Sequence, residues 1–123
     1  MTQRILVIED QEDLRAILRD LLTATGYEVL EARNGVEGVA KAEAERPDLF
    51  LMDIQLPQLD GYGATRRIKA LSGLQRTPII AVSSFAMKGD AERARDAGCD
   101  AYVTKPYSPM QLLTLVQKFL AKA

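Results

Sequence analysis

Hydrophobic and polar residues divide the chain into short apolar runs and longer stretches with helical spacing. The first, third and fourth runs are continuously apolar, which is typical of strands buried on both faces of a parallel sheet. The second and fifth runs are more mixed, as expected at the edges of a sheet. The five predicted strands are residues 4–9, 27–32, 49–53, 78–83 and 101–104.

Between these runs, apolar side chains return every three or four positions, which predicts helices. The first helix should end before Gly26, and its apolar stripe consists of Leu14, Ile17, Leu18, Leu21 and Leu22. Four more helices are expected at residues 36–45, at about 62–71, at about 87–97 and from about 108 onwards. The apolar stripe of the fourth is mostly alanine, so we expect that helix to be the least firmly packed.

Strand and helix alternate five times, which predicts the α/β class: a doubly wound (βα)5 sandwich with helices on both faces of a parallel sheet. The most apolar runs should be central, which favours the five-stranded order 2-1-3-4-5. A chain of 123 residues fits one domain, so we expect residues 1–123 to form a single domain without an output domain.

Composition excludes several classes of function. Sixteen basic and 17 acidic residues give a net charge of −1, which argues against binding nucleic acid through a broad basic field. The absence of histidine excludes Ser-His-Asp and Cys-His nucleophile systems, and a single cysteine excludes an internal disulfide. No apolar run approaches the ~20 residues that span a bilayer. We therefore expect a cytoplasmic protein with no membrane partner and no direct nucleic-acid partner.

Polar residues follow four of the predicted strands, at the edge of the sheet where doubly wound folds place their sites. These residues are Glu9 and Asp10, Asp53, Ser83 and Ser84, and Thr104 and Lys105. Three acids crowded together repel one another, and a hard divalent cation with oxygen ligands, Mg²⁺ or Mn²⁺, would relieve that repulsion. A second interpretation remains open for Asp10, which could cap the first helix.

The same residues fit phosphoryl transfer to an aspartate. If Asp53 attacked a phosphoryl group it would form an acyl phosphate, while the cation and Lys105 neutralised the phosphoryl oxygens and Ser83 donated a hydrogen bond. Asp53 ends an apolar strand, and we expect its carboxylate to lie in an exposed pocket at the end of that strand rather than to be buried.

The acid pair Glu9-Asp10, the segment MDIQLPQLDG, Ser83 and Lys105-Pro106 together resemble the response-regulator receiver domain, over the whole chain. The segments MDIQLP and FAMKGD look particularly like single-domain receivers of the DivK type. The resemblance implies a CheY-like, flavodoxin-like fold and a role in two-component signalling as a phosphoacceptor, not as an enzyme with turnover.

The resemblance also implies a role for each matching residue. Asp53 would be the phosphorylation site, with Ser83 and Lys105 binding the phosphoryl group. Asp10 would bind Mg²⁺ directly with help from Glu9, and the backbone carbonyl of Gln55 would be a further ligand. Tyr102 would turn inward with Ser83 on activation. The Lys105-Pro106 peptide bond would be cis.

Three positions influence what we expect of the phosphorylated state. Ser84 stands where many members of the family have alanine, and it is small enough to leave the site open. Gln55 and Phe85 occupy positions that tune hydrolysis of the acyl phosphate in this family. The bulk of Phe85 should exclude the attacking water, so we expect slow loss of the phosphoryl group.

The chain has no histidine, so a sensor histidine kinase or a phosphotransfer protein must supply the phosphohistidine. The output would be a changed surface that binds a downstream protein. We expect that surface on the fourth helix, fifth strand and fifth helix, near Lys88, Arg95, Tyr102 and Tyr107. Half-buried packing is the alternative interpretation for Tyr107.

Three other functions fit parts of the pattern. A haloacid-dehalogenase-like phosphatase also has a nucleophilic Asp after a strand, but it needs an acid two residues later, where this chain has Gln55. A phosphate-independent binding module should have lost some of the acids, Ser83 or Lys105. A nucleotide-binding protein needs glycine after the first strand, and this loop is acidic without one.

The remaining conspicuous residues have structural interpretations. Asp60-Gly61 is expected to be a turn and cap before the third helix, and Cys99 a small buried residue. The basic residues at 66–69 are expected to form a solvated helix face.

Overall fold

The computed structural model describes residues 2–84 and 89–121 and places the five apolar runs in one sheet. The strands are β1 (Arg4–Ile8), β2 (Glu28–Ala32), β3 (Leu49–Asp53), β4 (Ile79–Ser83) and β5 (Ala101–Thr104). Each neighbouring pair is parallel, and the order is β2-β1-β3-β4-β5, as predicted. All five residues of β3 and of β4 are buried, which explains their continuous apolar character.

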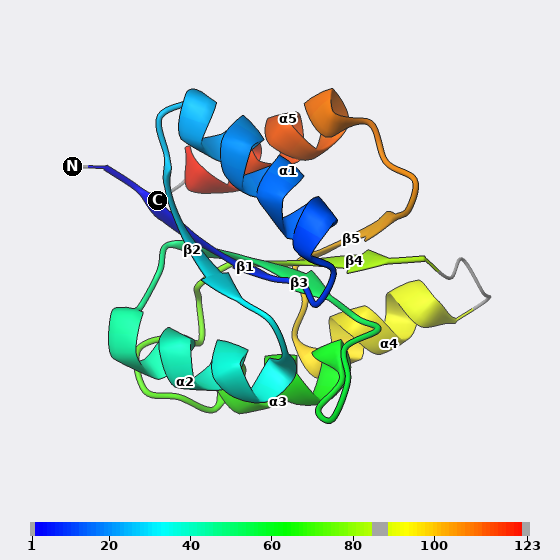
Figure 1. Cartoon of the computed structure of the whole chain (residues 1–123). Coiled ribbons are helices and arrows are strands. Elements are labelled where there is room, and N and C mark those ends of the chain that lie inside the picture. The colour runs from blue at the N-terminus through cyan, green and yellow to red at the C-terminus, as the bar shows by residue number, and fades with distance from the viewer. Residues whose placement is uncertain (1, 85–88, 122–123) are drawn as a thin grey trace.

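Helices cover both faces of this sheet (Figure 1). On one face lie α1 (Glu12–Ala24) and α5 (Pro109–Leu120), and on the other lie α2 (Gly35–Glu45), α3 (Gly61–Lys69) and α4 (Asp90–Ala97). None of the described helices is long and apolar enough to cross a membrane.

Alternate strand residues face the two helical layers and form two cores. In β3, for example, Leu49 and Leu51 pack with α1 and α5, whereas Phe50 and Met52 pack with the opposite layer. The two cores fix the position of the central strand, so they also fix where its last residue, Asp53, emerges.

Two helix predictions need correction. Ile17 belongs to the predicted buried stripe of α1, yet it is 56% exposed, because the helix packs through Leu18 and Leu22 and leaves Ile17 beside the loop after β5. The third helix ends at Lys69 rather than at about 71. The fourth is described from Asp90, after Gly89 with φ of 93°, and its predicted start at residue 87 lies outside the described residues.

The packing of α4 is as thin as its sequence predicts. Its buried side chains are Ala94 and Ala97. The guanidinium of Arg93 also lies 4.6 Å from the ring centre of Tyr62 on α3. These contacts bury far less apolar surface than α5 does with Leu112, Leu113, Val116 and Leu120.

Candidate functional site

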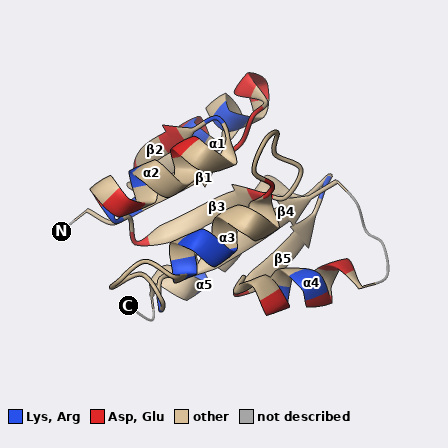
Figure 2. Ribbon diagram, turned by 90° about the horizontal axis from the view of Figure 1, so that it is seen from below, with Lys and Arg blue, Asp and Glu red and all other residues tan. Residues whose placement is uncertain are grey.

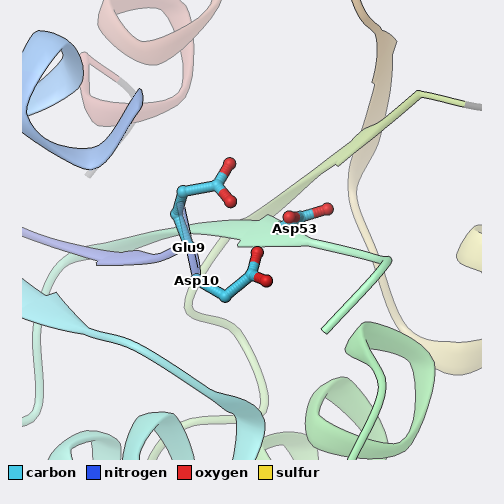
Figure 3. Close-up of side chains that lie close together, drawn as sticks. All are labelled: Glu9, Asp10 and Asp53. Carbon is cyan, nitrogen blue, oxygen red and sulfur yellow. The ribbon is translucent and has the colours of Figure 1, made fainter. Parts of the chain in front are cut away.

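Glu9, Asp10 and Asp53 converge at the carboxyl ends of β1 and β3 (Figure 3). Glu9 and Asp10 follow β1 directly, and Asp53 is the last residue of β3. One carboxylate oxygen from each residue lies within 4.8 Å of the other two. The predicted grouping of the three acids is therefore present, and it follows from the parallel pairing of β1 with β3.

Gly61, the first residue of α3, lies close to the acid cluster because it has no side chain. A Cβ at this position would lie 2.5 Å from the carbonyl oxygen of Asp53, which is too close for any side chain. Asp60 caps α3 by accepting a hydrogen bond from the Gly63 N–H at 2.8 Å, which confirms its predicted role.

Asp53 is buried, which corrects the prediction of an exposed carboxylate. The residue is only 4% exposed, and it lines a small cavity together with Glu9, Val82 and Tyr107. Its Oδ1 accepts a hydrogen bond from the Gln55 N–H at 3.0 Å, and its Oδ2 lies 3.6 Å from Lys105 Nζ. The two oxygens thus have different surroundings, and Oδ2 is the one that faces the lysine.

Glu9 is equally buried, at 3% exposure, and each of its carboxylate oxygens is bonded. The Gln11 N–H donates to Oε2 at 3.1 Å, and Lys105 Nζ donates to Oε1 at 3.0 Å. Burial raises the pKa of the Glu9 carboxyl, and its hydrogen bond and repulsion with Asp53 raise it further. Positive charge beside these buried acids, such as that of Lys105, therefore favours the ionised form of Glu9.

Asp10 differs from the other two acids because its side chain is exposed. It does not cap α1: the N-cap residue is Gln11, whose own side chain makes no capping bond and whose N–H donates to Glu9. The capping interpretation of Asp10 was therefore wrong. Its slight burial, and then the adjacent Glu9, raise the pKa of its carboxyl.

The Gln55 side chain joins the cluster to the end of β4. Its Nε2 donates to Ser83 Oγ at 2.6 Å, and its Oε1 accepts from the Ser84 N–H at 3.0 Å. Ser83 is buried and Ser84 is exposed. The sequence analysis assigned Gln55 a metal-ligating backbone carbonyl and an influence on hydrolysis of the acyl phosphate, but it missed these two side-chain bonds.

Lys105 comes from the loop after β5 and is the cation of the cluster. It reaches Glu9 at 3.0 Å and Asp53 at 3.6 Å, so in this structure it lies closer to Glu9. The peptide bond between Lys105 and Pro106 is cis, as the family resemblance implied.

The residues predicted to form a partner face have different surroundings in the structure. Tyr102 is half-buried and shares a groove of about 200 Å³ between α4 and β5 with the exposed Arg95. Tyr107 is half-buried and packs against the core on the α1 side, and burial, followed by the charges of Glu9 and Asp53, raises its pKa. Lys88 and Phe85 lie outside the described residues.

A second groove, of about 500 Å³, lies between α1 and the loop after β5. Its walls are mostly apolar, and Ser84 and Lys105 line it at the side of the acid cluster. The exposed side chain of Ile17 is part of this wall. The lining residues are Leu14, Ile17, Ser84, Lys105, Pro106, Tyr107 and Pro109.

Cys99 and the basic residues of α3 lie away from the acid cluster. Cys99 is buried, as predicted, and lies 3.6 Å from the Thr65 hydroxyl. Basic residues colour much of α3 blue (Figure 2). Arg66 and Arg67 are exposed, but Lys69 is not part of a solvated face. Its Nζ donates to the carbonyl of Thr77 at 2.7 Å and pairs with Asp100 at 3.4 Å, so it ties α3 to the next loop.

The donor set fits a hard divalent cation. Three carboxylates with oxygens within 4.8 Å, two of them nearly buried, supply the oxygen ligands and negative charge that Mg²⁺ prefers. Burial, followed by the adjacent Asp53, raises the pKa of Glu9, and a divalent cation beside Glu9 would favour its ionised form.

Comparison with known proteins agrees with this geometry. Residues 5–117 match the response regulator receiver domain, and the chain belongs to that family. It is 43% identical to the polar-differentiation response regulator DivK of Brucella anthropi and 42% identical to that of Brucella ovis, each over 123 residues and the full length of both chains.

Solved structures show the same fold. The receiver domain of a sensor histidine kinase from Pseudomonas aeruginosa PAO1, with a magnesium ion coordinated in its active-site cleft, superposes with a TM-score of 0.90 at 37% identity over 98% of this chain and 99% of that one. A CheY-like receiver from Methanospirillum hungatei JF-1 gives 0.93 at 31% identity over 99% and 96%.

Family membership makes this chain a response regulator receiver of two-component signalling, a signalling phosphoacceptor rather than a catalytic enzyme. A receiver domain implies a histidine kinase as partner. The expected fold, the CheY-like (βα)5 sandwich, is confirmed as well.

Proposed function

We propose that Asp53 accepts a phosphoryl group from a phosphohistidine of a partner protein, with Mg²⁺ bound beside it, and that phosphorylation changes a surface that binds a downstream protein. One observation carries this proposal: Asp53 shares a 4.8 Å cluster with Glu9 and Asp10 while its Oδ2 faces Lys105 Nζ at 3.6 Å. A nucleophile, a cation site and a phosphate-binding lysine are thereby brought to one place.

Glu9, Asp10, Asp53 and the backbone carbonyl of Gln55 would hold the Mg²⁺ or Mn²⁺ ion. When bound, the ion neutralises charge on the phosphoryl oxygens during transfer. The magnesium-containing receiver of the Pseudomonas aeruginosa kinase supports this assignment.

The transfer itself follows from the two oxygens of Asp53. The Gln55 N–H holds Oδ1, so the carboxylate is oriented with Oδ2 toward Lys105. Oδ2 attacks phosphorus, the new O–P bond forms as the N–P bond of phosphohistidine breaks, and the electron pair of that bond remains on the leaving imidazole. Lys105 and the Ser83 hydroxyl then bind phosphoryl oxygens.

The donor must reach a carboxylate that is only 4% exposed. The apolar groove between α1 and the loop after β5 opens beside Lys105, and Ile17 is exposed within it. An apolar surface at this position would let the phosphohistidine protein bind with its imidazole directed at the acid cluster. The chain has no histidine of its own to act as donor.

The output surface is assigned to α4, β5 and α5. Ser83 at the end of β4 would follow the phosphoryl group, and Tyr102 would move inward beside it. Tyr102 and Arg95 line one groove, and α4 is buried through only two alanines, so a small difference in free energy can favour a second packing. Lys88 completes the proposed surface from outside the described residues.

A phosphatase of the haloacid-dehalogenase type has less support. Its second acid would stand at Gln55, whose amide is already bonded to Ser83 and Ser84. A phosphate-independent binding module would have no need for three crowded acids and a lysine, whose repulsion and burial destabilise the fold.

The test is the mass of the intact protein after incubation with Mg²⁺ and a small acyl-phosphate donor, and separately with a phosphorylated histidine kinase. We expect a gain of one phosphoryl group, and no gain for Asp53→Asn. Asp60→Asn is the matched control, because this acid lies on the neighbouring loop but serves α3 as its cap. It should be phosphorylated like the wild type.

Failure of the wild type to gain mass with either donor would contradict the phosphoacceptor role. A gain that persists in Asp53→Asn would place the site elsewhere. Steady turnover of a phosphomonoester with Mg²⁺ would instead favour the phosphatase.

A further inference from the structure

Arg15 on α1 connects three elements next to the acid cluster. Its Nη1 donates to the backbone carbonyl of Glu9 at 2.9 Å, and its Nε donates to Glu31 Oε1 on β2 at 3.1 Å. Its side chain is only 11% exposed. Neither the sequence patterns nor the proposed chemistry gives this arginine a role.

The bond to Glu9 completes the anchoring of the turn that carries two of the three acids. The Glu9 N–H donates to the carbonyl of Ala32 at 3.0 Å, and the Glu9 carbonyl receives Arg15. Both backbone polar groups of Glu9 are thus held by hydrogen bonds. The directions in which Glu9 and Asp10 project depend on this backbone, because each side chain starts from it.

Glu31 keeps the guanidinium of Arg15 in place. Its carboxylate accepts from Arg15 at 3.1 Å, and its other oxygen lies 3.5 Å from Arg19, one turn further along α1. Its backbone carbonyl accepts from Lys41 on α2. Arg19 shares Glu31 with Arg15 but is 45% exposed, and its own side-chain bonds go to Glu31 and Asp20.

We infer that Arg15 is a positioning residue for the divalent-cation site: its two-pronged contact between the Glu9 carbonyl and Glu31 holds the turn from which Glu9 and Asp10 reach the ion. This inference rests on the proposed function. Partners that orient metal ligands in this way typically change metal affinity by about 10–100-fold when they are removed.

An arginine that acted only through its charge would change Mg²⁺ affinity in the opposite direction to a positioning arginine. Measuring that affinity therefore distinguishes the two roles. A permanent cation next to the cluster repels a second cation, so an arginine that acted only by its charge would weaken Mg²⁺ binding. Replacing such an arginine with a neutral residue would tighten Mg²⁺ binding. Replacing a positioning arginine should weaken it.

The experiment is a titration of the whole protein with Mg²⁺. Calorimetry measures the dissociation constant, and NMR measures the shift of the Gln11 amide resonance, because this amide donates to Glu9 Oε2. We expect Arg15→Gln to weaken binding about tenfold. Arg15→Lys keeps the charge but lacks the fork that spans both partners, so it should also weaken binding. Arg19→Gln, the matched control, should leave the affinity unchanged.

A readout without metal separates positioning from a general loss of stability. The Glu9 amide should exchange its hydrogen several-fold faster in Arg15→Gln than in the wild type or in Arg19→Gln, at a temperature where all three are folded. Unchanged or tighter Mg²⁺ binding by Arg15→Gln would overturn the inference while leaving the proposed function intact. Wild-type protein that binds no Mg²⁺ would overturn both.

Discussion

The side-chain amide of Gln55 donates a hydrogen bond to the hydroxyl of Ser83 at 2.6 Å. The same residue holds Asp53 Oδ1 through its backbone N–H and the Ser84 N–H through its Oε1. One side chain therefore links the end of β3, where the proposed phosphoacceptor stands, to the loop that follows β4.

Gln55→Met should loosen that loop, because methionine has a similar length but makes neither side-chain bond. We expect faster amide hydrogen exchange at Ser84 and a loss of about 1–2 kcal/mol in the free energy of unfolding, since each lost bond contributes about 1 kcal/mol. NMR exchange and urea denaturation measure the two effects. Gln117→Met, on an exposed part of α5, is the control. If the Ser84 amide of Gln55→Met exchanges at the wild-type rate, the Gln55 side chain does not restrain the loop after β4.

Phe85→Ala should shorten the lifetime of the acyl phosphate. The phenyl ring is expected to exclude the attacking water, so its removal admits that water to the phosphoryl group. Loss of the phosphoryl mass over time, after removal of the donor, measures the rate. A wild-type half-life of seconds that Phe85→Ala does not shorten would contradict this explanation.

Lys105→Gln should separate metal binding from phosphoryl transfer. Lys105 Nζ lies 3.0 Å from Glu9 and competes with a divalent cation for the acids, so its removal should tighten Mg²⁺ binding several-fold. Transfer should slow roughly 100-fold, as for loss of one donor to a developing negative charge. Mg²⁺ titration and initial rates of mass gain test both effects. Lys118→Gln on α5 should alter neither.

Glu9→Gln should stabilise the metal-free protein in a pH-dependent way. The folded state raises the pKa of Glu9 above its ordinary 4.5, because the carboxyl is buried and lies beside Asp53, while the Gln11 N–H and Lys105 offset part of this rise. The folded protein thus binds the Glu9 proton more tightly than the unfolded chain does, and ionisation of Glu9 opposes folding.

Below the ordinary pKa, Glu9 is protonated in both states, and the variant should have no advantage. As the pH rises through the raised pKa, the variant should become more stable than the wild type, and the difference should then level off. Urea denaturation between about pH 4 and pH 8 without divalent cations measures it. Mg²⁺ should reduce the difference. A variant less stable than the wild type at neutral pH would contradict the assigned direction.

Ile17→Glu should impair transfer from a phosphorylated kinase but not from a small acyl phosphate. The side chain is exposed in the groove beside Lys105, where a charge would oppose contact with an apolar partner surface. The control is Val36→Glu, because Val36 is similarly exposed, at 52% against 56%, but lies on α2. A rate comparison with both donors tests the assignment. Equal effects of the two variants would mean that the groove does not bind the kinase.

The arrangement of the acids was predictable from the sequence because parallel strands end at a common edge of their sheet. The apolar run of β3 stops at Asp53, and the strand order follows from which runs are most apolar. Given those two facts, the meeting of Glu9 and Asp10 with Asp53 needs no further information.

The contacts of Gln55 and Arg15 were not predictable in the same way. Gln55 reaches a residue 28 positions away, and Arg15 binds one that is 16 positions away. Such contacts depend on how a loop or a helix end is placed to within about an ångström, and no periodicity records this. The burial of Asp53 was missed for a related reason, since it depends on side chains from several strands and loops that close over the strand end.

The ion pair between Lys105 and Glu9 joins residues 96 positions apart in the sequence. A ribosome therefore produces the three acids early and the lysine only after most of the chain has been made. A nascent or truncated chain that ends before β5 contains the three acids but lacks Lys105. The proposed site is therefore complete only after β5 and the loop that follows it have been synthesised, and under the proposed function an unfinished chain would lack the lysine that binds the phosphoryl group.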